Sequence, residues 1–425
     1  MIISTVVVYL LAYMGKRIAT LDDIDISKKK VLVRVDINSP VNPKTGELID
    51  ISRIIEHSLT IKELISREAA VVVISHQGRP LDSDFTSLRI HATILSKILD
   101  IDVEFVEDTI GPYAKRAIEK LEPGGVLVLE NTRLLAEDNI EAPPEKHAES
   151  ILVSKLAPLF TYFVNDAFAT CHRSQASIVG FPLKIPSVAG RVLERELKAL
   201  NKIIEMPDKP KIFVLGGAKL DDTIRVIKYV FESGIADEVL TTGLVAILFL
   251  LAKGVKIPKD VESKILSKVP RELLNEARDL ISKYKNLKIP IDFIIEERDG
   301  AITVSHASIV TGIPKDIGPS TIEYYTYKIK RAKIVVMRGP AGVIEDPRFR
   351  VGTEALVKAA LESNAYTVFG GGHFISMASN LSAELKSRIG HLSTGGGALL
   401  YFLSGSILPG LEALVKSNEI FKIAV

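Results

Sequence analysis

The chain has 425 residues, of which 47% are hydrophobic and 25% are charged, and its formal net charge is +2, with 54 Lys and Arg against 52 Asp and Glu. This length exceeds that of one typical domain, so two or three domains are expected, and the nearly balanced charge argues against a generally basic surface for nucleic acid. The single cysteine, Cys171, excludes an internal disulfide and a cysteine-based zinc site, and it fits the reducing cytoplasm, where we expect the protein to reside.

The first segment, residues 1–13, is apolar. Its apolar run falls short of the roughly 18 residues that a membrane-spanning helix needs, and it has neither a basic n-region nor a small-residue cleavage site. We therefore interpret 1–13 as an extension that is neither anchor nor secretion signal. Two alternatives stay open: Met14 is the functional start, or the segment forms an extra edge strand.

Four apolar runs in the first half of the chain lead into polar side chains. They are VLVRVDIN from 31, AAVVVISHQGRP from 69, VLVLENTR from 126 and TYFVNDAF from 161. In an open α/β sheet the ligand lies beyond the carboxyl ends of the strands, so polar residues near these ends are expected to converge in space. The candidate residues are Asp36, Asn38, Arg53, His76, Arg79, Arg133 and Arg173. Most of them are basic, which predicts a pocket for a small polyanion.

Each of these residues has an ordinary structural explanation when it is considered alone. Asp36 and Asn38 are common turn formers. Arg53 fits the surface of a helix, and a lone histidine such as His76 is more often structural than functional. Arg34 shares a strand face with Asp36, and we interpret it as a solvated or ion-paired residue rather than as a ligand contact.

Strand-like runs alternate with amphipathic, helix-like stretches from about Val31 to the end of the chain. This alternation predicts an α/β fold of parallel sheets with crossover helices, and it argues against a sandwich or a helical bundle. The charged stretch at 257–286 is interpreted as surface helices without a chemical role.

The junction between two domains is predicted on a helix. Residues 189–210 repeat apolar and charged residues at helical spacing until Pro207. We place the bridging helix and hinge at 189–205, the first domain at 14–188 and the second at 206–405.

Glycine-rich segments follow strand-like runs in the second half. They are LGGAK from 215, TTGL from 241, RGPAG from 338, FGGGH from 369 and STGGG from 393. The glycines of the last two segments precede predicted helices, so backbone N–H groups and the helix dipole can hold phosphate oxygens there. Taken singly, such glycines can also mark only a tight turn.

Ten motifs, in order, resemble the successive signatures of phosphoglycerate kinases: VRVDIN, DISRI, SHQGRP, LENTR, VNDAFATCHRSQAS, LGGAK, DIGPST, GPAGVIE, GGGH and STGGGA. The resemblance runs from about Gly15 to Leu411. It implies an α/β fold of two Rossmann-like three-layer domains, each with a mostly parallel sheet, joined by a hinge helix, with segment 406–425 returning to the first domain. The implied activity is reversible phosphoryl transfer from 1,3-bisphosphoglycerate to ADP, giving 3-phosphoglycerate and ATP, with Mg²⁺ carried by the nucleotide.

The resemblance also implies roles for individual residues. The seven candidates of the first half would bind 3-phosphoglycerate, and Arg53 would face the transferring phosphoryl group. Lys219 would accompany that group, Glu345 would meet the ribose and Gly243 would line the adenine pocket. The implied catalytic set is Arg53, Lys219, Gly370 and Gly395. The implied nucleotide-binding set is Gly216, Gly217, Lys219, Gly243, Glu345, Gly370, Gly371, Gly372, His373, Ser393, Thr394, Gly395 and Gly396.

The chain departs from most of the family at four positions. Thr223 stands where most members have a lysine, Arg338 where they have an asparagine, Ala341 where they have a methionine and His373 where they have an aspartate; several of these changes look like the archaeal branch. Imidazole is a poor ligand for the hard Mg²⁺ ion, so we name no metal-binding side chain and expect nucleotide phosphates and water to hold the metal. Arg338 is hypothesised to replace the charge missing at Thr223.

The implied reaction needs no general base, because a carboxylate oxygen is already a competent nucleophile or leaving group. With the substrates on different domains, bending near 170–205 is expected to bring them together. The rivals are a non-catalytic paralogue that keeps both pockets, and a sugar or carboxylate kinase of another α/β family. We expect no nucleic-acid or membrane partner, and either a monomer or a dimer.

Overall fold

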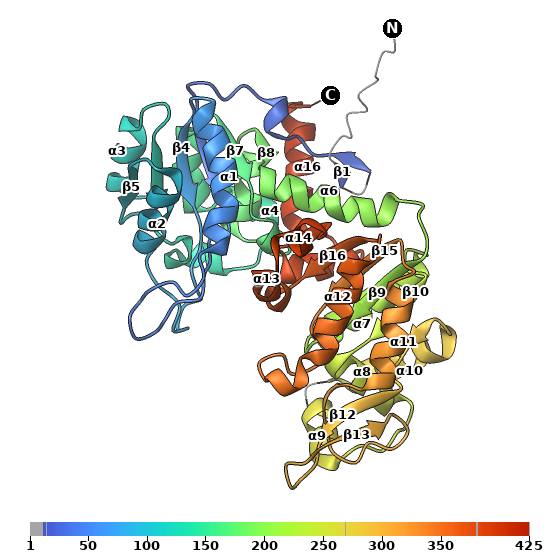
Figure 1. The fold of residues 1–425 in the computed structure, drawn as a ribbon. Helices are drawn as coiled ribbons and strands as arrows, with labels where there is room; N and C mark the ends of the chain where they lie inside the picture. Colours follow the sequence, from blue (N-terminus) through green and yellow to red (C-terminus); the bar gives the residue numbers. More distant parts are fainter. Residues whose placement is uncertain (1–11, 14, 268, 380, 425) are drawn as a thin grey trace. The chain divides into compact units, whose positions relative to one another are not determined.

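The computed structural model describes residues 12–424 except 14, 268 and 380, and these residues form two compact units (Figure 1). Unit 1 comprises the described residues up to Lys198 together with those from Ile407 onward, and unit 2 comprises Ala199–Ser406. Helix α6 (Arg191–Glu205) begins in unit 1 and ends in unit 2.

Most of the predicted N-terminal extension, residues 1–11, lies outside the described residues, as does Met14. The described part forms strand β1 (Ala12–Tyr13), which pairs antiparallel with β2 (Lys16–Arg17). The Tyr13 hydroxyl is buried and accepts a 2.8 Å hydrogen bond from the backbone N–H of Leu408. Tyr13 is therefore fastened to the C-terminal part of unit 1.

A six-stranded parallel sheet forms the centre of unit 1. In spatial order its strands are β5 (Val103–Val106), β6 (Val126–Leu129), β4 (Ala70–Ile74), β3 (Lys30–Arg34), β7 (Tyr162–Asn165) and β8 (Ser187–Ala189). Helices cover both faces of a parallel sheet, so its strands are apolar without interruption. Every residue of β4 is accordingly buried.

Two hydrophobic cores occupy the two faces of this sheet, because successive strand residues point to opposite sides. Val33 packs in one core with Ile54 and Leu95, whereas Leu32 packs in the other with Ile118. The helices of unit 1 are α1 (Ser52–Ser66), α2 (Arg89–Leu99), α3 (Pro112–Lys120), α4 (Pro144–Ala148), α5 (Ile151–Leu156) and α16 (Pro409–Phe421), besides the first turns of α6.

The C-terminal helix α16 packs within unit 1. The backbone N–H of Gly410 donates to the Cys171 carbonyl at 2.9 Å. The Ser417 hydroxyl accepts a 3.0 Å hydrogen bond from the Ser187 N–H, at the start of edge strand β8. The last helix of the chain thus covers elements formed some 230 residues earlier.

Unit 2 also contains a six-stranded parallel sheet, so the predicted α/β class is confirmed. In spatial order its strands are β11 (Leu287–Lys288), β10 (Glu238–Thr241), β9 (Lys211–Leu215), β15 (Ile334–Arg338), β16 (Tyr366–Gly370) and β17 (His391–Ser393). Its helices are α7 (Leu220–Glu232), α8 (Gly243–Ala252), α9 (Lys259–Leu266), α10 (Arg271–Lys283), α11 (Pro319–Ile329), α12 (Val351–Glu362), α13 (Gly372–Ser379), α14 (Ala383–Ser387) and α15 (Gly396–Leu403). Helices α9 and α10 lie where surface helices were predicted. No helix among the described residues has the length and apolar character needed to cross a lipid bilayer.

A smaller antiparallel sheet in unit 2 was not predicted. Its strands β13 (Ile302–His306) and β14 (Ile313–Ile317) pair with the two edges of β12 (Asp292–Glu296). The connection between β12 and β13 contains Asp299 and Gly300, a dipeptide typical of hairpin turns. This dipeptide is therefore the local sequence signal for the hairpin.

Candidate active site

The polar residues predicted in unit 1 lie beyond the carboxyl ends of neighbouring strands. Asp36 follows β3, His76 follows β4 and Arg133 follows β6. Asn38 joins two of these loops, because its Oδ1 accepts a 2.9 Å hydrogen bond from the backbone N–H of Gly78. Residues far apart in the sequence are thus brought to one edge of the sheet.

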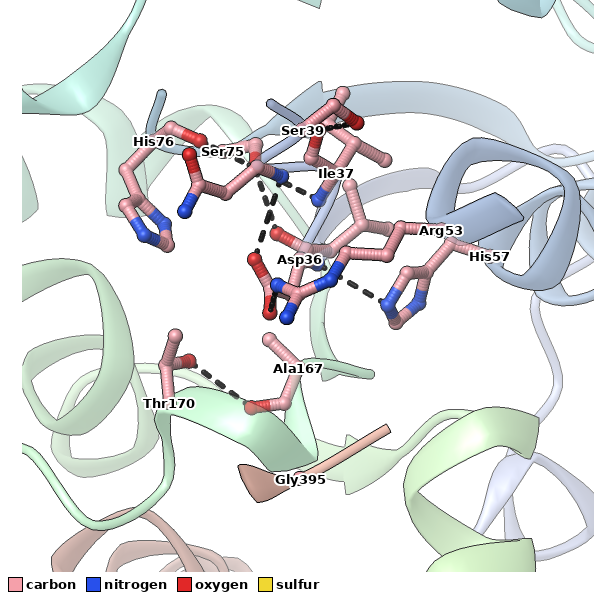
Figure 2. Close-up of polar contacts among 12 residues, drawn as sticks. Asp36, Ile37, Ser39, Arg53, His57, Ser75, His76, Ala167, Thr170 and Gly395 are labelled. Atoms are coloured by element: carbon pink, nitrogen blue, oxygen red, sulfur yellow. Dashed lines mark hydrogen bonds and ion pairs between the residues drawn. The ribbon is translucent and has the colours of Figure 1, made fainter. Parts of the chain in front are cut away.

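Arg53, in the first turn of α1, forms an ion pair with the carboxylate of Asp36 (Figure 2). The Asp36 side chain is only 3% exposed, whereas 34% of the Arg53 side chain remains accessible. Burial on its own raises the pKa of Asp36, but the surrounding positive charges, with Arg53 the strongest, lower the pKa below its usual value. Asp36 is therefore ionised at neutral pH, and Arg53 still has N–H groups to offer a ligand.

Arg34 fixes the protonation of His76. The Nη2 group of Arg34 lies 3.0 Å from Nδ1 of His76, and because arginine can only donate, Nδ1 must accept. The proton of the neutral ring therefore sits on Nε2. Burial, and then the charge of Arg34, hold the pKa of His76 well below its usual value. Arg34 was predicted to be solvated or ion-paired, and the first alternative is wrong, since Arg34 is 1% exposed; it also donates to Ser177.

Three further arginines surround this cluster. Arg133 is buried and donates to the Gly78 carbonyl, Arg173 is half-buried and Arg79 is exposed. The pKa of Arg133 is lowered to about 10, first by burial and then by the positive charges of Arg173, Arg34 and Arg79. Concentrated positive charge of this kind attracts small anions.

The backbone of the loop that carries His76 is held by the side chain of Asn131. Asn131 Oδ1 accepts hydrogen bonds of 3.1 Å from the N–H groups of both Gln77 and Arg133, and its amide donates to the Gln77 carbonyl at 2.8 Å. Gly78 has a φ of +64°, and a Cβ there would lie 2.5 Å from the backbone nitrogen of Phe85. Only glycine therefore fits this turn without strain.

In unit 2 the predicted glycines lie along the carboxyl edge of the sheet. Gly216 follows β9, Gly243 begins α8, Gly370 ends β16 and Gly396 begins α15. The segments that contain them also hold the other predicted glycines and polar residues, Gly217, Gly371, Gly372, Ser393, Thr394 and Gly395.

The loops after β9 and β15 approach each other closely. The Gly216 N–H donates to the Arg338 carbonyl at 2.8 Å. Gly339 has a φ of +76°, and a Cβ there would lie 2.2 Å from the Gly216 carbonyl oxygen. Glycines at this edge thus allow direct backbone contact between the loops.

A pocket of about 240 Å³ opens beside these loops. Four of the predicted nucleotide-site residues line it: Gly217, Gly243, Glu345 and His373. Apolar side chains complete the wall, namely Ala218, Leu244, Ile247, Phe293, Pro314, Pro340, Ala341 and Val343. A pocket whose lining is mostly apolar with a few polar groups is typical of a small-molecule binding site.

Asp316, at the end of β14, lines the same pocket but was not predicted. Its carboxylate accepts hydrogen bonds from the N–H groups of Gly352 at 2.7 Å and Ile317 at 2.8 Å. Burial raises the pKa of Asp316 to about 6 even though these two hydrogen bonds favour the charged form. Asp316 begins the DIGPST motif, but the antiparallel sheet that brings it to this pocket was not predicted.

Three residues near this edge differ in exposure and in hydrogen bonding: Lys219, Thr223 and Arg338. Lys219 precedes α7 and is exposed, whereas the buried Thr223 hydroxyl donates to the Lys219 carbonyl at 2.7 Å. Arg338 is 8% exposed, and its Nε has no hydrogen-bond partner among the described residues. Burial lowers the pKa of Arg338, and Asp222 partly offsets this. Thr223 is thus occupied within its helix, while Arg338 keeps an unused donor.

The side chains offer no assembled metal site within the described part of the chain, where no group of three or more His, Cys, Asp or Glu residues comes together. His373 Nε2 instead lies 3.2 Å from Glu345 Oε1. The His373 ring thus has a carboxylate neighbour at this edge.

Comparison with known proteins decides which family this arrangement belongs to. The family model of phosphoglycerate kinase matches residues 21–406. The chain belongs to the phosphoglycerate kinase family. The phosphoglycerate kinase of Aeropyrum pernix is 53% identical over 413 residues, covering 97% of this chain and 99% of that protein. The phosphoglycerate kinase of Saccharolobus solfataricus is 55% identical over 405 residues, covering 94% of this chain and 97% of its own length. The crystal structure of the enzyme from Pyrococcus horikoshii matches with a TM-score of 0.86 at 38% identity, covering 94% of this chain and 99% of that one.

These matches confirm the resemblance found in the sequence. Phosphoglycerate kinase is a phosphotransferase of glycolysis and gluconeogenesis, and it transfers a phosphoryl group reversibly between 1,3-bisphosphoglycerate and ADP. ATP and ADP enter as complexes with Mg²⁺. The alternative of a non-catalytic paralogue is not favoured.

Proposed function

We propose that the residues clustered in unit 1 bind 3-phosphoglycerate and that the glycine-rich edge of unit 2 binds the nucleotide. The observation that carries this assignment is the gathering of basic side chains: Arg53 pairs with Asp36, and Arg133 is buried near Arg173, Arg34 and Arg79, so that burial first and then their charges lower its pKa. The proposed substrate-binding residues are Asp36, Asn38, Arg53, His76, Arg79, Arg133 and Arg173. The proposed boundaries are 14–188 for the 3-phosphoglycerate-binding domain, 189–205 for the bridging helix and hinge, 206–405 for the nucleotide-binding domain and 406–425 for the segment that returns to the first domain.

The proposed roles in unit 1 follow from charge and exposure. Arg79, Arg133 and Arg173 hold the distal phosphate of 3-phosphoglycerate, because three guanidinium groups can satisfy its oxygens with charge-assisted hydrogen bonds. Asp36 is ionised and accepts from the substrate hydroxyl. His76, with its proton on Nε2, donates to the substrate.

The proposed catalytic groups stabilise charge rather than move protons. Arg53 and Lys219 are cations with accessible side chains, and we propose that both stabilise charge on the equatorial oxygens of the transferring phosphoryl group. Backbone N–H groups at Gly370 and Gly395 assist at the start of α13 and α15. The carboxylate of 3-phosphoglycerate needs no general base, because its oxygen is already a competent nucleophile. Bending within 170–205 then brings the two substrates together for in-line transfer.

The proposed nucleotide site uses the pocket beside β9 and β15. Gly216, Gly217 and Gly243 leave room for adenine, and Glu345 meets the ribose. The phosphates and their Mg²⁺ ion lie on two glycine segments, 370–373 and 393–396. The residues of these segments are Gly370, Gly371, Gly372, His373, Ser393, Thr394, Gly395 and Gly396.

We further propose that the protein is a monomer or dimer in the cytoplasm. Cys171 is buried, and burial raises the pKa of its thiol well above the usual value, so we expect the thiol to be unreactive. Light scattering during gel filtration checks the oligomeric state, and a tetramer or larger assembly would contradict it.

The substrate assignment predicts strong discrimination between 3-phosphoglycerate and glycerate, which lacks the distal phosphate. In a coupled assay with MgATP, kcat/KM for glycerate is expected to be lower by at least about 10³, since several charge-assisted hydrogen bonds worth about 1.5–3 kcal/mol each are lost. Arg79→Ala should reduce the ratio of kcat/KM for 3-phosphoglycerate to kcat/KM for glycerate by about tenfold or more, because it weakens the binding of only the substrate that carries the phosphate.

Arg89→Ala serves as the matched control, because Arg89 is 62% exposed and pairs with Glu107 on the surface. It should leave the ratio between the two acceptors unchanged. If Arg79→Ala also leaves the ratio between the two acceptors unchanged, the distal phosphate binds elsewhere.

Arg338 is expected to support the nucleotide in place of the lysine absent at Thr223. Its unpartnered Nε at the edge of the sheet motivates this hypothesis. Arg338→Asn should raise KM for MgATP by about tenfold, the effect of losing one charge-assisted hydrogen bond, while KM for 3-phosphoglycerate changes little. Arg331→Asn, at an exposed arginine after α11, is the control. Unaltered nucleotide affinity and turnover in Arg338→Asn would rule out compensation.

A further inference from the structure

A buried histidine connects the proposed substrate site to the start of helix α6. His57 lies on α1, one turn after Arg53, and its side chain is 2% exposed. The backbone N–H of Asp36 donates to His57 Nε2 at 3.3 Å (Figure 2). On the other side of the ring, Nδ1 lies 2.8 Å from Oδ2 of Asp166, whose side chain is fully buried.

Asp166 in turn holds the first turn of α6. Its Oδ1 accepts hydrogen bonds from the backbone N–H groups of Val192 at 2.8 Å and Leu193 at 3.3 Å. A Cβ on Gly190 would lie 2.3 Å from this same oxygen, so the residue before the helix must be small. One carboxylate therefore caps α6 and orients His57.

These partners determine which ring nitrogen of His57 carries the proton. Nε2 faces an N–H group and must accept, so the proton of the neutral ring is on Nδ1, where it is donated to Asp166. A proton on Nε2 would instead oppose the Asp36 N–H. The carboxylate of Asp166 thus selects the tautomer that can hold the Asp36 backbone.

Ion pairs and hydrogen bonds also join α1 to the first two turns of α6. Glu56 pairs with Arg195, and Glu63 accepts 2.7 Å hydrogen bonds from Nε and Nη2 of Arg191. Between them, the Thr60 hydroxyl accepts from the Arg191 backbone N–H at 3.1 Å. The helix that carries Arg53 is therefore bound along its length to the beginning of α6.

We propose that His57 is a positioning residue for phosphoryl transfer, which fixes the Asp36 backbone and the Arg53-bearing helix against the capped first turn of α6. His57 touches no substrate in this account and acts through Asp36 and Arg53. The inference rests on the proposed function, because it takes these two residues as part of the 3-phosphoglycerate site. The helix that it fixes continues into unit 2, so His57 also ties the substrate site to the connection between the units.

Two substitutions separate this positioning role from a merely structural one. In His57→Gln the side-chain oxygen can take the place of Nε2 and accept from Asp36, whereas in His57→Asn the amide takes the place of Nδ1 and keeps only the bond to Asp166. Both variants lose one buried hydrogen bond and should melt at lower temperature. In His57→Asn the Asp36 N–H is left without an acceptor. Its kcat/KM for 3-phosphoglycerate should therefore be about fivefold to a hundredfold lower than that of His57→Gln.

The melting temperature of each variant is measured first. The kinetic assay, which gives kcat and KM for both substrates, is then run well below the lower of the two melting temperatures. Lys62→Ala, at an exposed position of α1, is the control and should match the unaltered protein. A value for His57→Asn at least about fivefold below that for His57→Gln supports the proposal, and any smaller or reversed difference overturns it. If Arg53→Ala has no effect in the same assay, the site assignment itself fails.

Asp166→Asn gives an independent test should the His57 variants fold poorly. Asparagine keeps the shape of the cap but presents a donor to His57, which forces the ring proton to Nε2, as in catalytic triads where the same change reverses the tautomer. In ¹⁵N-histidine spectra the His57 proton should move from Nδ1 to Nε2, with a loss of about tenfold or more in kcat/KM for 3-phosphoglycerate. A moved proton without that loss, or a proton found on Nε2 in the unaltered protein, would overturn the proposal.

Discussion

Substitution of Arg53 by alanine is expected to lower kcat by at least about 10³, which is the scale of effect of an arginine that stabilises a transferring phosphoryl group. The guanidinium is partly accessible while one of its nitrogens is held by Asp36, so it is oriented before substrate binds. Its removal also leaves the Asp36 carboxylate, 3% exposed, without its main counter-charge. KM for 3-phosphoglycerate should therefore rise as well.

Steady-state kinetics with 3-phosphoglycerate and MgATP measure this effect. Arg53→Lys keeps a positive charge but not the planar fork of donors, so it should recover only part of the lost turnover. Arg89→Ala, which removes an exposed arginine elsewhere in unit 1, should leave kcat unchanged. A kcat for Arg53→Ala within tenfold of the unaltered enzyme would exclude a role at the transferring group.

Lys219→Ala should lower kcat by about 10² to 10³, as the loss of one preorganised electrostatic group in a transfer site typically does. Lys219 is exposed, precedes α7 and follows the Gly216 loop, so its ammonium can reach phosphate oxygens held at that edge. KM for MgATP should change less than kcat, because the charge acts mainly on the phosphoryl group in transfer.

Single-turnover measurements separate this chemical step from product release. Lys228→Ala, on the helix α7 that follows Lys219, is the matched control, because Lys228 is 48% exposed and pairs with Glu276 on the surface. If Lys219→Ala raised only KM for MgATP while the single-turnover rate stayed unchanged, Lys219 would be a binding residue and its proposed catalytic role would be wrong.

The α/β class could be predicted because its causes are local. Strands such as β4 are buried on both faces, and a continuous run of Ala, Val and Ile records that burial directly in the sequence. The antiparallel sheet formed by β12, β13 and β14 was missed, because β13 is largely exposed and lacks such an apolar run. Its clearest signal was the Asp299–Gly300 turn.

The candidate site could be predicted as far as its residues carry charge or follow strands in recognisable motifs. Asp36 and Arg53 meet as an ion pair in the structure, which their separate places in the sequence only suggested. Arg34, His57 and Asp166 could not be assigned in the same way, because their importance lies in which neighbours they contact after folding. Such contacts connect residues up to 143 positions apart and leave no periodic pattern.

We propose that the basic residues clustered in unit 1 hold 3-phosphoglycerate while the glycine-rich edge of unit 2 holds the nucleotide. A crystal structure with 3-phosphoglycerate and a non-transferable MgATP analogue would show both sites at once. We expect the distal phosphate within hydrogen-bond distance of Arg79, Arg133 and Arg173, and the adenine in the pocket lined by Gly217 and Gly243. A distal phosphate that contacts none of these arginines, or a nucleotide bound away from that pocket, would contradict it.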